Sequence, residues 1–206
     1  MRVIQRRMRK INEIFYSIQG EGCRAGVPSV FIRFSGCNLK CGFCDTHHQD
    51  GKWMTDEDII REVNKYPATM VVLTGGEPSL WIDKEFIYNL KTGTCKSIAI
   101  ETNGTVPLPD GIDWITVSPK TGMSPMGDAE VTCSYADEVK VVDIGQDLNQ
   151  YFELECVART TEMLLQPCYV EDAIEREKNT LRTIRRVMED PRWRLSLQTH
   201  RYLGIS

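Results

Sequence analysis

Short apolar runs, separated by polar segments rich in glycine and proline, recur along the whole chain. Each run has the length of a strand, and Met70–Leu73 is apolar throughout, as expected for a strand buried on both faces. The runs predict strands at residues 11–18, 30–34, 70–73, 97–101, 114–118, 138–142, 161–165 and 193–197. We expect the first two of these strands to deliver their carboxyl ends to one place, as in parallel folds.

Helical periodicity fills only some of the connections between these runs. Thr55 and Asp58 form a pattern like a capping box, which predicts a helix over residues 55–66. Helices are also expected at 83–91, at 146–152 and over 171–189, where Ala173, Ile174, Leu181, Ile184, Val187 and Met188 form an apolar stripe. Residues 106–113 and 119–137 contain proline and glycine and lack a helical period.

These elements predict an α/β fold: a partial, open (β/α) barrel with about six βα strands and a reduced set of outer helices. The 206 residues, 41% of them hydrophobic, suffice for the core of a single domain over residues 1–206. No stretch approaches the roughly 18 apolar residues of a membrane span, and the N-terminus lacks the apolar core of a secretion signal. We therefore expect an intracellular protein without membrane contacts.

Charge and cysteine usage narrow the class of partner and the compartment. A net charge of -4 gives no general attraction to nucleic acid, and the basic stretches at 1–10 and 176–194 suit a solvated surface. Neither stretch interleaves the aromatic residues expected of a single-strand platform, so no nucleic-acid partner is expected. Five of the eight cysteines are scattered, at 23, 95, 133, 156 and 168, which favours a reducing cytoplasm over a disulfide framework.

The other three cysteines are closely spaced in the pattern C-x3-C-x2-C: Cys37, Cys41 and Cys44. Structural zinc takes four closed ligands, and an iron-sulfur cluster used only for electron transfer takes four cysteines. A cluster held by three cysteines leaves one iron open to a small molecule, so this spacing favours chemistry at the cluster. The alternative is a zinc site whose fourth ligand is Cys23, His47 or His48.

A glycine pair directly follows the apolar run at 70–73. Gly75 and Gly76 allow the backbone to approach a ligand where a side chain would obstruct it, and Glu77 adds a hydrogen-bond acceptor. A plain turn would also use two glycines. The position after a buried strand favours a binding role.

Two levels of resemblance follow from these motifs. The three cysteines, with Phe43 before the last of them, and Thr74-Gly-Gly-Glu-Pro78 resemble the motifs of radical S-adenosylmethionine enzymes. Further segments resemble the 7-carboxy-7-deazaguanine synthase family: Tyr16-Ser-Ile-Gln-Gly-Glu-Gly22, Arg33-Phe-Ser-Gly-Cys-Asn-Leu-Lys-Cys41, Cys44-Asp-Thr46, Glu101-Thr-Asn-Gly-Thr105, Val117-Ser-Pro-Lys120, Leu165-Gln-Pro167 and Gln198-Thr-His-Arg-Tyr-Leu203. Together they span nearly the whole chain.

The resemblance implies a carbon-nitrogen lyase that converts 6-carboxy-5,6,7,8-tetrahydropterin to 7-carboxy-7-deazaguanine, a queuosine precursor, and releases ammonia. It also implies a 4Fe-4S cluster on the three cysteines, S-adenosylmethionine and Mg2+ as cofactors, a reductant such as flavodoxin or ferredoxin, and a homodimer. Two alternatives remain. One is a glycyl-radical-activating enzyme, against which Gln19, Glu21 and Arg33 argue, and the other is a non-catalytic iron-sulfur or zinc module that binds nucleic acid.

The resemblance also implies roles for individual residues. Substrate would be held by Ile18, Gln19, Gly20, Glu21, Arg33, Thr74, His200 and the carboxylate of Ser206. S-adenosylmethionine would contact Gly76, Glu77, Ser118, Pro119, Lys120, Gln166, Pro167, Cys168 and Tyr169, and Thr46 would bind Mg2+. The planar guanidinium of Arg33 suits a carboxylate. A structural histidine at 200 and a hydroxyl bonded to local backbone at 46 are the alternatives for those two positions.

Overall fold

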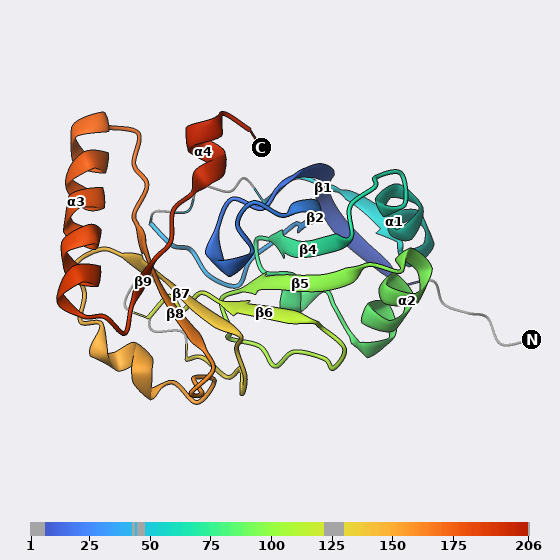
Figure 1. The fold of residues 1–206 in the computed structure, drawn as a ribbon. Helices are drawn as coiled ribbons and strands as arrows, with labels where there is room; N and C mark the ends of the chain where they lie inside the picture. Colours follow the sequence, from blue (N-terminus) through green and yellow to red (C-terminus); the bar gives the residue numbers. More distant parts are fainter. Residues whose placement is uncertain (1–6, 43, 45–47, 122–129, 206) are drawn as a thin grey trace, which may run out of the picture.

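The framework of the protein is one nine-stranded sheet with the strand order β3-β1-β2-β4-β5-β6-β7-β8-β9. The computed structural model describes residues 7–42, 44, 48–121 and 130–205 (Figure 1). Its strands are β1 (Met8–Ile18), β2 (Pro28–Phe34), β3 (Lys52–Thr55), β4 (Met70–Gly75), β5 (Ser97–Thr102), β6 (Trp114–Val117), β7 (Glu138–Asp143), β8 (Glu162–Pro167) and β9 (Arg194–Leu195). All pairs from β2 to β9 are parallel. Among these strands β3 and β9 form the two ends, so the sheet stays open, as predicted.

The first strand runs against its neighbour, contrary to the expectation of a common direction. β1 pairs with β2 in antiparallel register, with Ile18 opposite Pro28. The connection over residues 19–27 is too short for the crossover of a dozen or more residues that parallel neighbours need. β3, which the apolar pattern did not predict, extends the sheet by pairing antiparallel with β1.

Three main helices cover the sheet, in agreement with the reduced set expected. They are α1 (Asp56–Val63), α2 (Lys84–Thr94) and α3 (Ala173–Glu189), followed by the short α4 (Thr199–Leu203). Thr55 caps α1 by accepting a hydrogen bond from the Asp58 backbone N–H at 3.1 Å. The described parts of 103–113 and 118–137 contain no helix. The predicted helix at 146–152 is a 3-10 turn, Asn149–Glu153, and the predicted last strand shortens to Arg194–Leu195.

The apolar core has three clusters, two on the outer face of the sheet and a smaller one on the inner face, formed by Phe31, Met70, Val72 and Ala99. α1 and α2 lie side by side (Figure 1), and their Ile59, Phe86 and Leu90 pack on Leu73 and Ile100 of the strands. A second cluster packs Tyr151 and Trp193 against the strands around β7 and β8: Val117, Val139, Val141 and Leu165. Full burial of each such side chain stabilises the fold by about 1.5 to 3 kcal/mol.

The longest helix docks through polar side chains and only part of the predicted apolar stripe, since Val187 packs against the second core cluster and Ile184 is half-buried. The fully buried residues of α3 are Asn179 and Thr183. Asp143, with no exposed surface, accepts hydrogen bonds from Thr183 Oγ1 at 2.8 Å and Arg186 Nη1 at 2.6 Å. A buried carboxylate needs such partners. Because Thr183 and Arg186 face Asp143, the opposite face of α3 lies towards solvent, where Ile174, Leu181 and Met188 are 68%, 54% and 81% exposed.

The C-terminal segment is fixed to the loop that follows β1. Thr199 donates from its backbone N–H and its Oγ1 to the Gly20 carbonyl oxygen, both at 2.9 Å. Gln198 Nε2 donates to Glu21 Oε1 at 2.8 Å. The docking of this tail therefore rests on polar contacts, while Tyr202 and Leu203 are exposed. None of the described helices has the length and apolar character needed to cross a membrane.

Candidate active site

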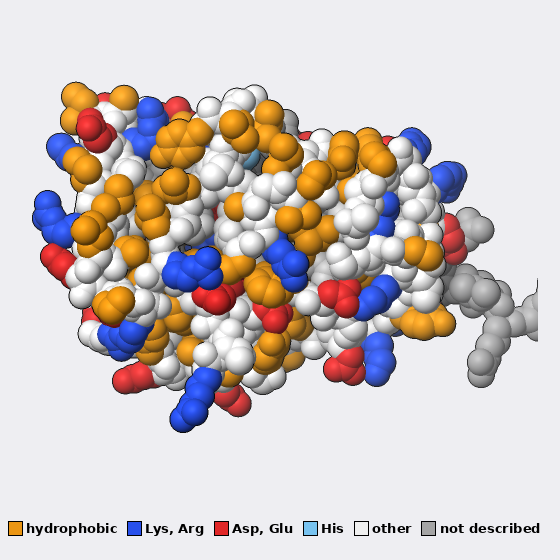
Figure 2. Space-filling model, viewed as in Figure 1, with side chains coloured by type: hydrophobic (Ala, Val, Ile, Leu, Met, Phe, Trp, Pro, Cys, Tyr) orange, Lys and Arg blue, Asp and Glu red, His pale blue; other side chains and the backbone are white. Residues whose placement is uncertain are grey.

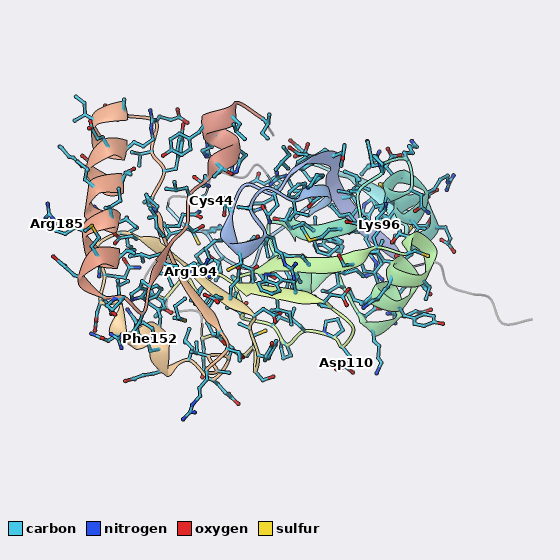
Figure 3. The ribbon with its side chains drawn as sticks, viewed as in Figure 1. Cys44, Lys96, Asp110, Phe152, Arg185 and Arg194 are labelled. Atoms are coloured by element: carbon cyan, nitrogen blue, oxygen red, sulfur yellow. The ribbon has the colours of Figure 1, made fainter. Side chains whose placement is uncertain are left out.

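Two adjoining cavities lie on the inner face of the sheet, opposite the two outer core clusters. The larger has a volume of about 560 Å³ and the smaller one of about 210 Å³. Five residues line both and form their common boundary: Glu21, Thr74, Glu101, Tyr169 and Gln198. The region lies between α3 and the α1–α2 pair, where Figure 3 labels Cys44. A group bound in one cavity is therefore next to a group bound in the other.

The three clustered cysteines line the smaller cavity together. The Cys44 backbone N–H donates to the Cys41 carbonyl oxygen at 3.2 Å, and the Leu39 N–H lies 3.4 Å from Cys37 Sγ. Burial raises the pKa of the Cys37 and Cys41 thiols. Three thiols arranged around a cavity fit a multi-iron cluster that keeps one iron open. Phe43 and Thr46, to which the sequence assigns roles here, lie outside the described residues.

The zinc alternative finds no support in the described residues. Neither Cys23 nor His48 lines the cysteine cavity, and His47 lies outside the described part of the chain. Cys23 instead contacts Arg194 and Glu138, and burial, followed by Glu138, raises its pKa to about 12. Nowhere in the described ranges do three His, Cys, Asp or Glu side chains converge on a site for a single metal ion.

A glycine contact fixes the start of the cysteine loop against the end of β4. A Cβ atom on Gly76 would overlap the carbonyl oxygen of Gly36, directly before Cys37. The Glu77 N–H donates to that same oxygen at 2.9 Å. Only glycine permits this approach, so the Gly-Gly turn sets where the first cysteine lies.

Side-chain amides tie the cysteine loop to the end of β5. Asn38 Nδ2 donates to Thr105 Oγ1 at 2.8 Å, and Asn103 Nδ2 donates to Asn38 Oδ1 at 3.0 Å. The Asn103 N–H donates in turn to Glu77 Oε2 at 2.8 Å. The Glu-Thr-Asn-Gly-Thr motif at the end of a predicted strand was the available signal for this contact, although the sequence gives these residues no role.

Glu77 is almost completely buried, with 1% of its surface exposed. Besides Asn103, its carboxylate accepts from Ser79 N–H at 3.0 Å and Thr102 Oγ1 at 2.6 Å. It lines the smaller cavity, so this charge is held in place by three donors at the edge of the site.

Most residues expected at S-adenosylmethionine surround the cysteine cavity. Those that line it are Gly76, Glu77, Ser118, Lys120, Gln166, Pro167 and Tyr169. Lys120 Nζ donates to the Ser118 carbonyl oxygen at 2.8 Å and to its Oγ at 2.6 Å, and burial lowers the Lys120 pKa. Pro119 does not line the cavity. Cys168 instead lines a third cavity beside α3 and α4, where its carbonyl accepts from Asn179 at 3.0 Å.

The residues expected at the substrate surround the larger cavity. Those that line it are Ile18, Gln19, Gly20, Glu21, Arg33, Thr74 and His200, whereas Ser206 lies outside the described residues. Arg33 Nε donates to Glu13 Oε1 at 2.7 Å, and its guanidinium lies 5.4 Å from the Phe15 ring centre. Phe15 stacks on Phe31 at 4.9 Å, and both rings line the same cavity. The pocket thus combines an aromatic wall with a cation suited to a carboxylate.

Two charged residues of the site were missing from the sequence prediction: Glu101, which lines both cavities, and Lys140, which lines the smaller one. Lys140 Nζ donates to Glu101 Oε2 at 2.7 Å and to Glu21 Oε2 at 2.6 Å. Burial alone would raise the pKa of Glu21, but the charge of Lys140 and its hydrogen bond lower it to about 2. A lysine inside the apolar run 138–142 was the signal, because a buried ammonium requires partners.

Comparisons with known proteins agree with these motifs. The model of the radical SAM superfamily matches residues 31–130. The chain is 54% identical over 198 residues to 7-carboxy-7-deazaguanine synthase of Bacteroides thetaiotaomicron, covering 96% of this chain and 99% of that protein. It is 38% identical to the synthase of Nitratidesulfovibrio vulgaris, covering 95% and 98%. The crystal structure of QueE from Escherichia coli superposes with a TM-score of 0.75 at 30% identity, covering 94% and 95%.

Proposed function

Since the chain belongs to the 7-carboxy-7-deazaguanine synthase family of the radical S-adenosylmethionine superfamily, we propose that it converts 6-carboxy-5,6,7,8-tetrahydropterin to 7-carboxy-7-deazaguanine. One observation carries the proposal beyond family membership. Every described residue expected at the substrate lines one cavity, and that cavity shares a wall with the one lined by the three cysteines. A carbon radical produced at the cysteines would thus meet its substrate without crossing solvent.

The proposed reaction needs no net oxidant or reductant. Substrate and product differ by ammonia alone, so the ring contracts with loss of one nitrogen and no change in overall oxidation state. When bound, the 4Fe-4S cluster and S-adenosylmethionine supply the radical that removes hydrogen from C6 of the pterin and later returns it. An external reductant is then required only to begin this chemistry.

The residues of the larger cavity hold and orient the pterin in this proposal. Arg33 keeps nitrogen donors available beyond the one it gives Glu13, and these pair with the substrate carboxylate. Glu21, ionised at neutral pH, accepts from the amide and amino edge of the ring. Phe15 and Phe31 form a flat apolar wall against which a planar ring packs. Gln19 and Thr74 add polar contacts, and His200 closes the cavity beside Gly20.

The residues of the smaller cavity bind the cluster and the cosubstrate. Cys37, Cys41 and Cys44 would hold three irons, and the fourth would remain for S-adenosylmethionine. Lys120 offers an ammonium to a carboxylate, and Ser118 Oγ offers a partner to a ribose hydroxyl. The open backbone at Gly76 admits the methionine end of the molecule. Pro119 and Cys168 act through the backbone of the segments that carry them.

Two proposed ligands belong to residues outside the described ranges. Thr46 supplies a hard oxygen to Mg2+, which keeps several waters and takes oxygens from the substrate. Ser206 is proposed as a substrate ligand. The position of α4 supports this, because Ile205, its neighbour, lines the larger cavity.

Self-association is proposed through α3. Ile174, Leu181 and Met188 are spaced by two helical turns, so they lie on one face, and all three are exposed. Figure 2 shows apolar side chains on this helix and on α4, on the solvent side of the molecule. A second copy of the chain would cover this stripe to give the homodimer. Sedimentation at micromolar concentration measures the mass directly, and a monomer would contradict it.

The remaining proposals concern organisation and surroundings. One continuous sheet supports a single domain over residues 1–206. No disulfide links any of the eight cysteines, all of which the structure describes, which supports a reducing cytoplasm. Flavodoxin or ferredoxin is the proposed electron donor. No role for a nucleic acid is proposed, since the net charge is -4.

The decisive experiment is an anaerobic incubation of reconstituted protein with the pterin, S-adenosylmethionine, Mg2+ and a reductant. Mass spectrometry should find 7-carboxy-7-deazaguanine and an equal amount of ammonia. Protein lacking reductant is the control. Cleavage of S-adenosylmethionine without any deazaguanine would leave the radical chemistry standing and refute the substrate.

A further inference from the structure

Lys140 is a buried cation in the middle of a strand whose neighbours are apolar. It is 5% exposed, while Val139 and Val141 on either side enter the outer core. Side chains alternate across a strand, so Lys140 points to the inner face. A buried ammonium is costly unless it is paired, and Lys140 Nζ lies 2.6 Å from Glu21 Oε2 and 2.7 Å from Glu101 Oε2.

Each of these carboxylates also accepts amide hydrogen bonds, Glu101 from Gln19 and Glu21 from Gln198 and Gln166. Gln19 Nε2 donates to Glu101 Oε1 at 3.0 Å, and Gln198 Nε2 donates to Glu21 Oε1 at 2.8 Å. The network therefore joins β5, β7, the loop after β1 and the segment before α4. Burial raises the pKa of Glu101, and the charge of Lys140 opposes this shift. A carboxylate has about four lone-pair sites, so Glu21 and Glu101 both retain acceptor capacity after these contacts.

The two carboxylates and Lys140 differ in which cavities they line. Glu21 and Glu101 line both cavities, whereas Lys140 lines only the smaller one. The ammonium thus approaches the two carboxylates from the cysteine side. Their unused acceptor sites remain for a ligand in the larger cavity.

We propose that Lys140 is the positioning residue of the larger cavity, holding Glu21 and Glu101 side by side as two acceptors for neighbouring N–H donors on one edge of a planar nitrogen heterocycle. The inference rests on the proposed function, in which the heterocycle is the pterin and the donors are its ring amide and its amino group. In this proposal Lys140 acts on the heterocycle through the two carboxylates, because it does not line the larger cavity. Without it, two carboxylates would repel each other, and at least one would turn away or take up a proton.

A purely structural role for Lys140 makes a different prediction. A lysine that only neutralises a buried pair would, when removed, lower the fraction of folded protein and leave the affinity of each folded molecule unchanged. A positioning lysine changes substrate affinity in molecules whose cluster and cosubstrate site are intact. Arginine in its place would keep two donors and restore much of that affinity.

The test compares Lys140→Met, Lys140→Arg and the surface control Lys84→Met as anaerobically reconstituted holoenzymes. Lys84 is a matched control because its side chain is 78% exposed. The dissociation constant of the pterin is measured by calorimetry with S-adenosylmethionine present and reductant absent, and the cluster by its visible absorption. We expect Lys140→Met to weaken pterin binding about tenfold to a hundredfold, as loss of charge-assisted hydrogen bonds does. The dissociation constant of Lys140→Arg should stay within about threefold of the wild-type value. Lys84→Met should bind the pterin as tightly as wild type.

A double variant keeps the test informative if Lys140→Met folds poorly. Glu21→Gln with Lys140→Met removes one negative and one positive charge together, so the buried net charge stays the same. If Lys140 acts through Glu21, the double variant loses less affinity than the product of the two single losses. Where Lys140→Met does not fold, the double variant should bind no more than about threefold weaker than Glu21→Gln alone.

Several outcomes would overturn the inference. Unchanged pterin affinity in folded Lys140→Met would do so, as would an equal loss of affinity for S-adenosylmethionine, or losses that multiply in the double variant. Failure of the proposed function looks different, since wild-type protein would then neither bind nor convert the pterin. A wild type that converts the pterin, beside a Lys140→Met protein that binds it equally well, refutes only the role of Lys140.

Discussion

The two faces of the same sheet obey different physical rules. On the outer face, β4 and β5 present Leu73 and Ile100 to α1 and α2, and burial of apolar surface accounts for the contact. On the inner face, Glu101 and Lys140 form hydrogen bonds whose distances are all 3.0 Å or less. Apolar packing tolerates substitutions of similar volume, whereas a buried charge network fails when one member is removed. At these positions stability and chemistry are therefore separable, and three substitutions and one truncation test how far.

The largest expected effect is on the inner face. Cys41→Ala should abolish cleavage of S-adenosylmethionine, because only two of the three thiolates would remain for the cluster. Cys95→Ala, which changes an exposed cysteine outside both cavities, is the matched control and should retain activity. Product chromatography and the visible spectrum measure the two effects. Full activity of Cys41→Ala would refute the cluster assignment.

On the outer face, Phe86→Ala should remove stability instead of chemistry. Phe86 is fully buried and meets the Phe34 ring edge to face at 6.1 Å, so truncation should cost about 3 to 5 kcal/mol. Tyr88→Ala on the same helix changes a side chain that is 67% exposed and should cost less than about 0.5 kcal/mol. Urea unfolding gives both values. Equal costs for the two would mean that α2 does not rely on this core.

Asp143 forms the polar contact between β7 and α3, so its substitution tests how much this contact contributes to stability. Although burial would raise its pKa, hydrogen bonds from Thr183 and the Gly145 backbone, with the charge of Arg186, lower it. A depressed pKa contributes stability above the ordinary aspartate value of about 3.9, and this contribution disappears as the pH falls through the folded-state value.

We therefore expect Asp143→Asn to lower the free energy of unfolding by roughly 2 kcal/mol at pH 7, since Arg186 is partly exposed and solvent screens the pair. The difference from wild type should shrink towards pH 3. Urea titrations of cluster-free protein at pH 7, 5 and 3 measure it. A difference that stays constant over this range would show that the carboxylate is not responsible.

The smallest expected effect concerns the C-terminal tail. Deleting Tyr202 to Ser206 removes Ile205 from the wall of the larger cavity and leaves every cysteine in place. Pterin affinity should fall by about tenfold, equivalent to about 1.4 kcal/mol, with an unchanged cluster spectrum. Tyr202→Ala, which changes an exposed side chain outside that cavity, serves as the control. Unchanged affinity after the deletion would remove the tail from the site.

Sequence reasoning succeeded wherever the signal is local. The spacing of Cys37, Cys41 and Cys44, the glycine pair after β4 and the missing crossover helices all depend on residues close together in the chain. Strand positions followed from apolar runs for the same reason. The direction of β1 was predicted wrongly, although the short connection to β2 already excluded a parallel pair.

Contacts between distant segments required the structure. The apolar pattern of α3 correctly included Val187 but not the polar contacts of the helix, because Asp143 lies 40 positions before Thr183 and no residue of the helix indicates that this carboxylate needs partners. Glu101 and Lys140 were not predicted for the same reason: their partners are distant in the sequence. Lys140 meets Glu21 across 119 positions and Glu101 across 39.

By itself, the sequence determined the family, the three thiols and the succession of strands, since ligand spacing and apolar periodicity are properties of neighbouring residues. Only the tertiary structure decided which charges share the boundary between the cavities and which face of α3 meets solvent. The physical reason is that a buried charge must find its partner in space, and the chain leaves that partner unspecified until the sheet has formed.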